Sequence, residues 1–281
     1  MIIDSHTHAW QRWPYKPPVP DDESRGKVEQ LLYEMDQNNV DIAIIICARI
    51  DRNEDNNDYI ADCIRNYPGR LIQFADVDCS WTKTYHTKGA SDRLMEAAVK
   101  YDLKGYTHYL REDDDVSWFF SEDGQRFLQA TADMDLIVSI TIGPHQQSAL
   151  RKIAQRYPSI PFLCHHIGGA KAGEQIPYEN FKEILESAKV PNIYIKISGF
   201  AYVSQVSWEY PYLDTSRIVK GIYEHYGAER LCWGSDYPVV RSFMTYKHSI
   251  EALRSHSPFI PEDEKPLILG DNIYRLLTQG H

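Results

Sequence analysis

The feature that most constrains the fold is an alternation between short apolar runs and segments of helical periodicity, repeated along the whole chain. The apolar runs carry many β-branched residues without strict alternation, which is typical of parallel strands buried on both faces. We expect eight strands, at Ile2–Ser5, Ile42–Cys47, Leu71–Val77, Lys104–His108, Leu136–Thr141, Pro161–His165, Ile193–Ser198 and Arg230–Ser235.

Helical stripes lie between these runs. Val28, Leu31, Leu32 and Met35 recur with i, i+3, i+4, i+7 spacing, and similar stripes follow at 94–101, 127–134 and 218–225. Strand–helix alternation repeated eight times predicts an α/β fold, a single (β/α)8 TIM-barrel domain over residues 1–281, a length ordinary for a fold of about 250 residues. The alternative is an open doubly wound sheet, but no Gly-x-Gly-x-x-Gly or Walker loop follows any strand.

Composition excludes several classes of function. Thirty Lys and Arg against forty Asp and Glu give a net charge of -10, which disfavours nucleic acid and anionic membranes as partners. We see no signal peptide and no apolar run near the ~20 residues of a membrane span. The five cysteines are widely spaced without a CxxC, which indicates a reducing compartment. We expect a cytoplasmic protein that acts on a small-molecule substrate, and a homodimer is compatible with the sequence.

A His-x-His pair ends the first predicted strand, in Asp4-Ser5-His6-Thr7-His8. Side chains alternate along a strand, so His6 and His8 point the same way and can converge on one ion. Divalent zinc takes nitrogen and oxygen ligands at about 2.0–2.2 Å. Taken alone, the pair could equally be two unrelated surface histidines.

Two further predicted strands also end in ligand-type residues. The run from Pro161 leads into His165 and His166, and the run from Leu231 ends in Asp236. Singly, Asp236 could cap a turn and either histidine could be a core residue. Because the carboxyl ends of barrel strands meet at one mouth, together they favour a divalent metal site, zinc or alternatively manganese, whose expected ligands are His6, His8, His166 and Asp236.

Five more residues are candidates for binding substrate. His108 ends a strand and is expected to face the same mouth, for substrate binding or proton transfer. Lys196 could stabilise developing negative charge or hold a substrate carboxylate. The alternative is a snorkelling or ion-paired lysine without a role in catalysis. Arg49 and Arg241 could clamp a carboxylate, against the plainer alternative of surface ion pairs. His165 is expected beside the site in a supporting role, because its neighbour His166 should point the other way.

The order of these motifs resembles the amidohydrolase-related branch of the amidohydrolase superfamily. That branch holds metal-dependent decarboxylases, such as aminocarboxymuconate-semialdehyde decarboxylase, and lactonases acting on sugar lactones or pyrone dicarboxylate. The resemblance implies the barrel, with His6, His8, His166 and Asp236 around the metal position. The stretches that carry it run nearly end to end: Ile3–Trp10, Leu103–Gly105, His166–Gly169, Tyr194–Gly199, Gly234–Pro238 and Leu269–Asn272.

Details of these motifs bear on the activity. Trp10 and the Lys196-Ile197-Ser198-Gly199 strand end resemble the lactonases, and the further histidine that decarboxylases usually carry on this strand is absent. Thr141 stands where a histidine often follows the fifth strand. In contrast, His165-His166 replaces the Asp-His usual in lactonases, and the His-x-Gly-Gly sequence is closer to the metal-binding members.

We therefore expect a hydrolase that opens a lactone of a sugar acid or small carboxylate with an activated water. Asp236 would be the general base, with His166 beside it as a second catalytic residue. The alternative is a non-oxidative decarboxylase of an aromatic or muconate-type acid. Whether the histidines hold a metal or orient the substrate directly stays open. No Gly-x-Ser-x-Gly elbow occurs, which disfavours a serine triad.

Overall fold

Residues 1–279, which the computed structural model describes, contain eight parallel strands that neighbour one another in sequence order. Ten α-helices and several short 3-10 or π turns connect and cover them. The strands are β1 (Ile3–Thr7), β2 (Ile42–Ile46), β3 (Leu71–Asp76), β4 (Gly105–Tyr109), β5 (Ile137–Thr141), β6 (Phe162–Cys164), β7 (Ile193–Ile197) and β8 (Leu231–Trp233). The helices are α1 (Val28–Asn38), α2 (Asn56–Asn66), α3 (Ala90–Tyr101), α4 (Glu122–Asp133), α5 (Gln147–Arg156), α6 (Glu179–Glu186), α7 (Phe200–Val203), α8 (Leu213–Tyr226), α9 (Tyr246–Arg254) and α10 (Asn272–Thr278).

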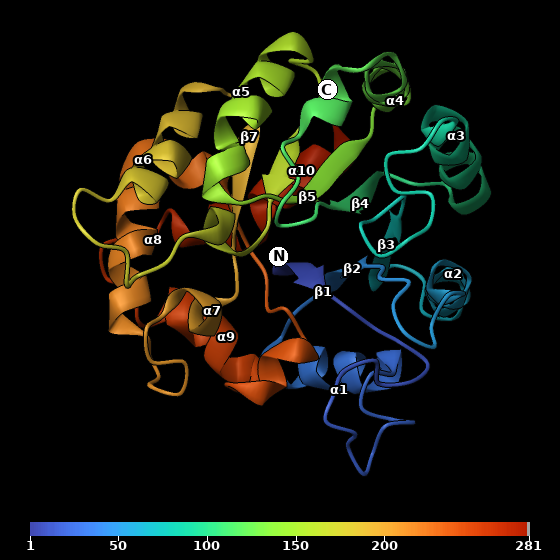
Figure 1. Ribbon diagram of the computed structural model, residues 1–281. Helices are drawn as coiled ribbons and strands as arrows, with labels where there is room; N and C mark the ends of the chain where they lie inside the picture. Colours follow the sequence, from blue (N-terminus) through green and yellow to red (C-terminus); the bar gives the residue numbers. More distant parts are fainter. Residues whose placement is uncertain (280–281) are drawn as a thin grey trace.

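The helices surround the strands, so each strand is covered on its outer face by helices and on its inner face by other strands (Figure 1). This double burial explains why the strands are apolar without alternation. Inward-facing side chains such as Ile44, Phe74 and Leu163 fill the barrel axis, and Ile273 and Leu276 of α10 pack against them from the amino-terminal end of the strands. The expected single-domain (β/α)8 barrel is confirmed.

The seam between β8 and β1 is closed by hydrogen bonds around the ends of the two strands. The backbone nitrogen of His8 donates to the carbonyl of Tyr237 at 2.7 Å, and that of Asp236 donates to the carbonyl of His6 at 2.8 Å. Lower in the seam, the buried Asp4 carboxylate accepts hydrogen bonds from the Ser235 amide and the Tyr246 hydroxyl, each at 2.9 Å. These bonds fix the register of the first strand against the segment after the last.

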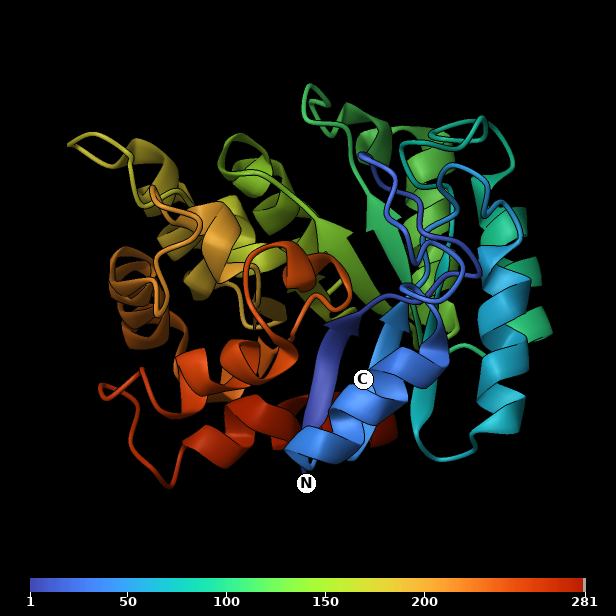
Figure 2. The same ribbon diagram turned by 90° about the horizontal axis from the view of Figure 1, so that it is seen from below.

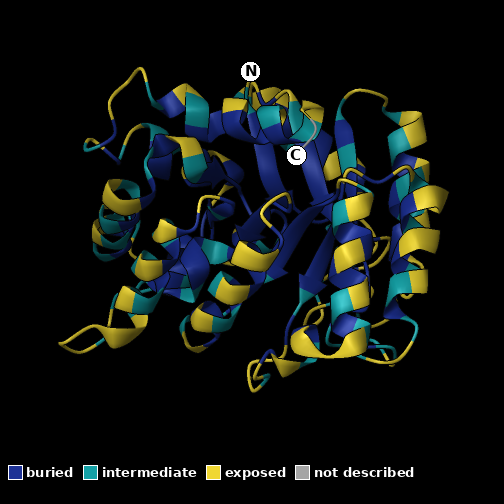
Figure 3. Ribbon diagram, turned by 90° about the horizontal axis from the view of Figure 1, so that it is seen from above, coloured by how far each residue is buried: buried dark blue, intermediate teal, exposed yellow. Residues whose placement is uncertain are grey.

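The helical stripes occupy the positions that their spacing predicts. In α1, Val28, Leu31, Leu32 and Met35 are the buried residues. Figure 3 shows the same pattern throughout, with buried strands and helices exposed on their outer sides. Across residues 1–279, no helix is both long enough and apolar enough to cross a membrane.

Long loops gather at the carboxyl ends of the strands (Figure 2). Two of them contain ordered contacts of their own. The aromatic segment after β7 is not all loop, because α7 begins directly at Phe200. The acidic run 112–115 is not wholly solvated, because Asp114 accepts a hydrogen bond from Tyr85 and its Oδ2 lies 3.3 Å from Nδ1 of His86. The loop after β3 thus provides the partners that draw Asp114 inward.

Candidate active site

Four of the predicted ligands converge at the carboxyl end of the barrel. His6 and His8 lie on and just after β1, and their Nε2 atoms are 3.5 and 3.2 Å from Oδ1 of Asp236. The His166 ring lies 4.7 Å from the His6 ring, measured between centroids. Strand alternation accounts for the shared direction of His6 and His8, and the β1–β8 seam places Asp236 opposite them. His6, His8 and Asp236 are almost fully buried, and His166 is half-buried.

His166 reaches this position through a left-handed turn. The strand β6 ends at Cys164, and the backbone φ angle is 44° at His166, 58° at Ile167 and 66° at Gly168. An extended chain would send His165 and His166 in opposite directions, as expected from the sequence. The turn instead leaves both rings near His6, with the His165 centroid 4.5 Å away.

His165 supports the site, because both of its ring nitrogens are already engaged. Nε2 lies 2.7 Å from Oγ of Ser139, and Nδ1 lies 2.8 Å from Oγ1 of Thr141. Thr141 and Ser139 both belong to β5, so this strand supplies hydrogen-bonding partners rather than a ligand. The ring is 2% exposed.

The donor atoms at this end of the barrel fit a divalent metal ion in two overlapping sets, His6 with His8 and Asp236, and His6 with His165 and His166. Nδ1 of His8 is bonded to the Ile46 carbonyl at 2.7 Å, and Nδ1 of His166 to Ser198 Oγ at 3.0 Å, which leaves Nε2 of each ring available. Nε2 of His6 is buried without a hydrogen-bonding partner. The ligand atoms of His6, His8 and Asp236 lie within 4.8 Å of one another. Imidazole nitrogen and carboxylate oxygen are the donors that zinc and related divalent ions take.

The protonation states also suit ligands. Burial lowers the pKa values of His6 and His166, so both rings are neutral near pH 7. Burial alone would raise the pKa of Asp236, but the neighbouring His166 and His8 and the Tyr202 hydroxyl outweigh it and hold that pKa below its usual value. Asp236 is therefore ionised at neutral pH.

Lys196 lies beneath this cluster rather than in the mouth. Its Nζ donates to Ser139 Oγ at 2.7 Å and lies 3.4 Å from Nδ1 of His6. The residue is 0% exposed, and burial lowers its pKa to about 7. It is part of the site, but it lies on the inner side of His6, away from the mouth where a substrate would enter.

Three other predicted site residues lie elsewhere. Alternation along β4 places Gly105 and Tyr109 on the inner face, so His108 faces outward and packs beside Phe127 of α4. Arg49 donates from its side chain to the Glu54 carbonyl at 2.8 Å and is exposed, and Arg241 is exposed on the turn after β8.

Tyr202 is a site residue that sequence reasoning did not single out. It lies on α7, and its hydroxyl donates to Oδ2 of Asp236. Gly199, with a φ of 69°, makes the turn from β7 into α7. A Cβ at this glycine would lie 2.6 Å from the Tyr202 ring and 2.9 Å from Nδ1 of His166. The aromatic richness of this segment was the available signal, but it did not distinguish one tyrosine.

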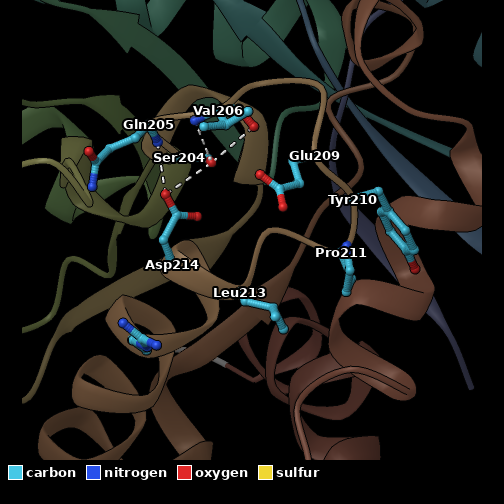
Figure 4. Close-up of a pocket in the computed structure, with 9 residues that line it drawn as sticks. Ser204, Gln205, Val206, Glu209, Tyr210, Pro211, Leu213 and Asp214 are labelled. Carbon is cyan, nitrogen blue, oxygen red and sulfur yellow. Dashed lines mark hydrogen bonds between the residues drawn. The ribbon is translucent and has the colours of Figure 1, made fainter.

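A separate hollow of about 360 Å³ lies in the loop between α7 and α8 (Figure 4). Its lining includes Ser204, Gln205, Tyr210 and Asp214, and none of the converging site residues. The Asp214 carboxylate is used inside the loop, where it accepts from Ser204 Oγ at 3.1 Å and from the Gln205 amide at 2.9 Å. We therefore attribute this hollow to the packing of the loop and not to the active site.

Comparison with known proteins places the chain among relatives of the same architecture. It is 25% identical over 250 residues to an L-fucono-1,5-lactonase from Burkholderia ambifaria, covering 85% of this chain and 81% of that protein. A probable 2-pyrone-4,6-dicarboxylic acid hydrolase from Acinetobacter baumannii superposes with a TM-score of 0.76 at 22% identity, covering 99% of both chains. An amidohydrolase from Burkholderia multivorans with bound zinc gives a TM-score of 0.80 at 17% identity, again over 99% of both chains.

The amidohydrolase family model matches residues 3–278, which is nearly the whole chain and includes every side chain of the site. This chain is therefore a member of the amidohydrolase family.

Proposed function

We propose that this amidohydrolase is a lactonase, which opens the ring of a lactone derived from a sugar acid or a small carboxylate. The observation that carries the proposal is the buried, ionised Asp236 carboxylate, placed between the histidines and the Tyr202 hydroxyl. The likeness to a protein named as an L-fucono-1,5-lactonase supports the lactone as substrate class.

Each side chain has a role in this proposal. Asp236 accepts the proton of the attacking water and returns it to the ring oxygen that leaves. Tyr202 holds Oδ2 of Asp236, so that Oδ1 stays directed at the histidines. The half-buried His166 is the most accessible of the four side chains, and its free Nε2 binds the metal ion or, in an enzyme without metal, orients the substrate carbonyl.

His6, His8, His166 and Asp236 would hold the metal ion, zinc or alternatively manganese. A bound divalent ion supplies Lewis acidity, which polarises a carbonyl and makes a neighbouring water more acidic. The Burkholderia multivorans structure with bound zinc supports zinc in this fold. If the enzyme works without metal, the free Nε2 atoms of the histidines orient the carbonyl by hydrogen bonds instead.

The end of β7 favours hydrolysis over decarboxylation. It carries Lys196 and leads into Ser198, and it lacks the further histidine that the resemblance leads one to expect in a decarboxylase. Ser139 and Thr141 of β5 engage both ring nitrogens of His165, which leaves no free imidazole nitrogen on that side of the site.

The test is a substrate panel with two readouts. Aldonolactones and small carboxylated lactones are assayed by proton release with a pH indicator, and aromatic and muconate-type acids by carbon dioxide release. Metal content is measured on the same preparation by mass spectrometry. We expect proton release only, at a rate that Asp236→Asn lowers by about 10²-fold or more, the usual scale for losing a general base.

Glu183→Gln is the matched control, because Glu183 pairs with Arg151 on the helical layer, far from the site. It should turn over lactones like the unmodified enzyme. Carbon dioxide release from the acids, or full lactonase activity in Asp236→Asn, would refute the proposal. Lactonase activity in metal-free protein would support the lactonase proposal and show that the reaction does not need the metal.

A further inference from the structure

Lys196 is a buried amine without a carboxylate partner. It lies on β7 with no exposed surface, and no ion pair found among residues 1–279 includes it. Burying an amine without a counter-charge costs stability, and replacing such a group with an apolar side chain of similar size is often neutral or stabilising. The packing of the barrel therefore gives no reason for a lysine at this position.

Both hydrogen-bonding contacts of the amine lead to histidines, one directly and one through Ser139. Nζ lies 3.4 Å from Nδ1 of His6, the inner nitrogen of that ring. The outer nitrogen, Nε2, remains without a hydrogen-bonding partner and faces Oδ1 of Asp236 at 3.5 Å. Lys196 thus engages one end of the His6 ring and leaves the other end open to the site.

A second set of contacts runs from Lys196 to His165. The amine donates to Ser139 Oγ at 2.7 Å, and Ser139 Oγ lies 2.7 Å from Nε2 of His165. Nδ1 of His165 lies 2.8 Å from Thr141 Oγ1. These contacts hold the orientation of the His165 ring, which packs edge-on against His6.

We propose that Lys196 is a positioning residue that sets the ring of His6 from beneath, directly and through Ser139 and His165. This differs from the substrate-binding role expected from the sequence. The proposal rests on the proposed function insofar as His6 acts as a ligand or orients the carbonyl. The positioning itself is a property of the metal-free protein and is measured there.

The test compares two lysine-to-methionine variants. Lys196→Met removes the amine from the site, whereas Lys265→Met is a matched control. Lys265 is also buried, at 5% exposure, but it donates to the Arg254 carbonyl at 2.7 Å and to Glu262, away from the site. Three quantities are measured: the His6 ring nitrogen shifts by NMR in metal-free protein, the zinc affinity by competition with a chelator, and the melting temperature.

For Lys196→Met we expect the His6 ring nitrogen signals to shift toward those of a mixture of tautomers, with the assignment made by His6→Asn. Zinc affinity should fall about 10- to 100-fold, the range for the loss of a residue that orients a ligand. The melting temperature should stay the same or rise. Lys265→Met should lower the melting temperature and leave the NMR signals and zinc affinity unchanged.

Ser139→Ala is the second variant, and it decides the outcome if Lys196→Met does not fold. It removes the hydroxyl that anchors the amine, and it should shift the His6 signals and weaken zinc binding in the same direction. Unchanged His6 signals in the folded variants would overturn the proposal, as would equal zinc-affinity losses in Lys196→Met and Lys265→Met. Shifted signals in a protein that binds no zinc would uphold the positioning role and refute only the metal site.

Discussion

Replacing Gly199 with alanine tests whether the approach of Tyr202 to Asp236 sets the activity. Gly199 has a φ of 69°, and a Cβ there would lie 2.6 Å from the Tyr202 ring and 2.9 Å from Nδ1 of His166. Both distances are below 3.0 Å, which real Cβ contacts essentially never show. The Tyr202 and His166 rings must therefore both shift, or the backbone at residue 199 must.

Gly69 provides the matched control. Its φ is 78°, and among the described residues nothing lies within 4 Å of a Cβ built there. Alanine at either glycine bears a similar backbone strain, roughly 1–2 kcal/mol for an L-residue in the left-handed region. Gly199→Ala should lose a further 1–3 kcal/mol, roughly, because of the added contacts.

The effect on activity follows from the Tyr202 hydroxyl. A hydrogen bond to a charged group contributes about 1.5–3 kcal/mol, and 1.36 kcal/mol corresponds to about tenfold in rate. If the ring is displaced, kcat/KM for lactone hydrolysis should fall about 10- to 100-fold in Gly199→Ala and remain unchanged in Gly69→Ala. Denaturant unfolding measures the stability of both variants. Equal kcat/KM values in the two variants would refute this account of Gly199.

Three further predictions can be checked with simple assays. Tyr202→Phe keeps the ring and removes only the donor to Asp236, so kcat/KM should fall about tenfold or more with little change in melting temperature; an unchanged rate would argue against the role of the hydroxyl. Burial lowers the pKa of His86 to about 4 from about 6.5 in the unfolded chain, so the unfolded state binds more protons between these pH values and stability falls as the pH drops through them. The loss should be about 1–2 kcal/mol for this partly exposed ring, and His86→Gln should flatten the dependence of unfolding free energy on pH. All five cysteines are buried, and burial raises their thiol pKa values, so a thiol reagent should label none in the native protein and all five after unfolding; rapid native labelling would contradict this.

The sequence predicts the barrel well because each strand is buried on both faces and each helix on one. It also identifies His6, His8 and Asp236, since their positions depend only on strand alternation and on the meeting of strand ends. His108 shows the limit of this reasoning. A shift of one residue along a strand exchanges its inner and outer faces, and the apolar run around it does not say which residue faces the axis.

The remaining site residues depend on local backbone geometry. His166 and Ile167 take positive φ angles that a sequence pattern does not reveal, although the two glycines that follow are a partial signal. Lys196 is predicted in the site but not beneath it, because strand alternation gives the face on which a side chain lies and not its depth in the barrel. The position of Tyr202 depends on the tight turn at Gly199. The sequence does not show which side chains that glycine contacts.

The β1–β8 seam also bears on how the site forms during synthesis. The contact between Asp4 and Ser235 joins residues 231 positions apart, a distance that a ribosome covers in roughly 12 to 46 seconds at 5–20 residues per second. Through that interval the nascent chain presents His6 and His8 without the carboxylate that faces them. A two-histidine pair would hold an ion far more weakly than the completed set, so an ion bound at the proposed metal site would be captured only once the last strand docks. Loading of that site and closure of the barrel would then coincide late in folding.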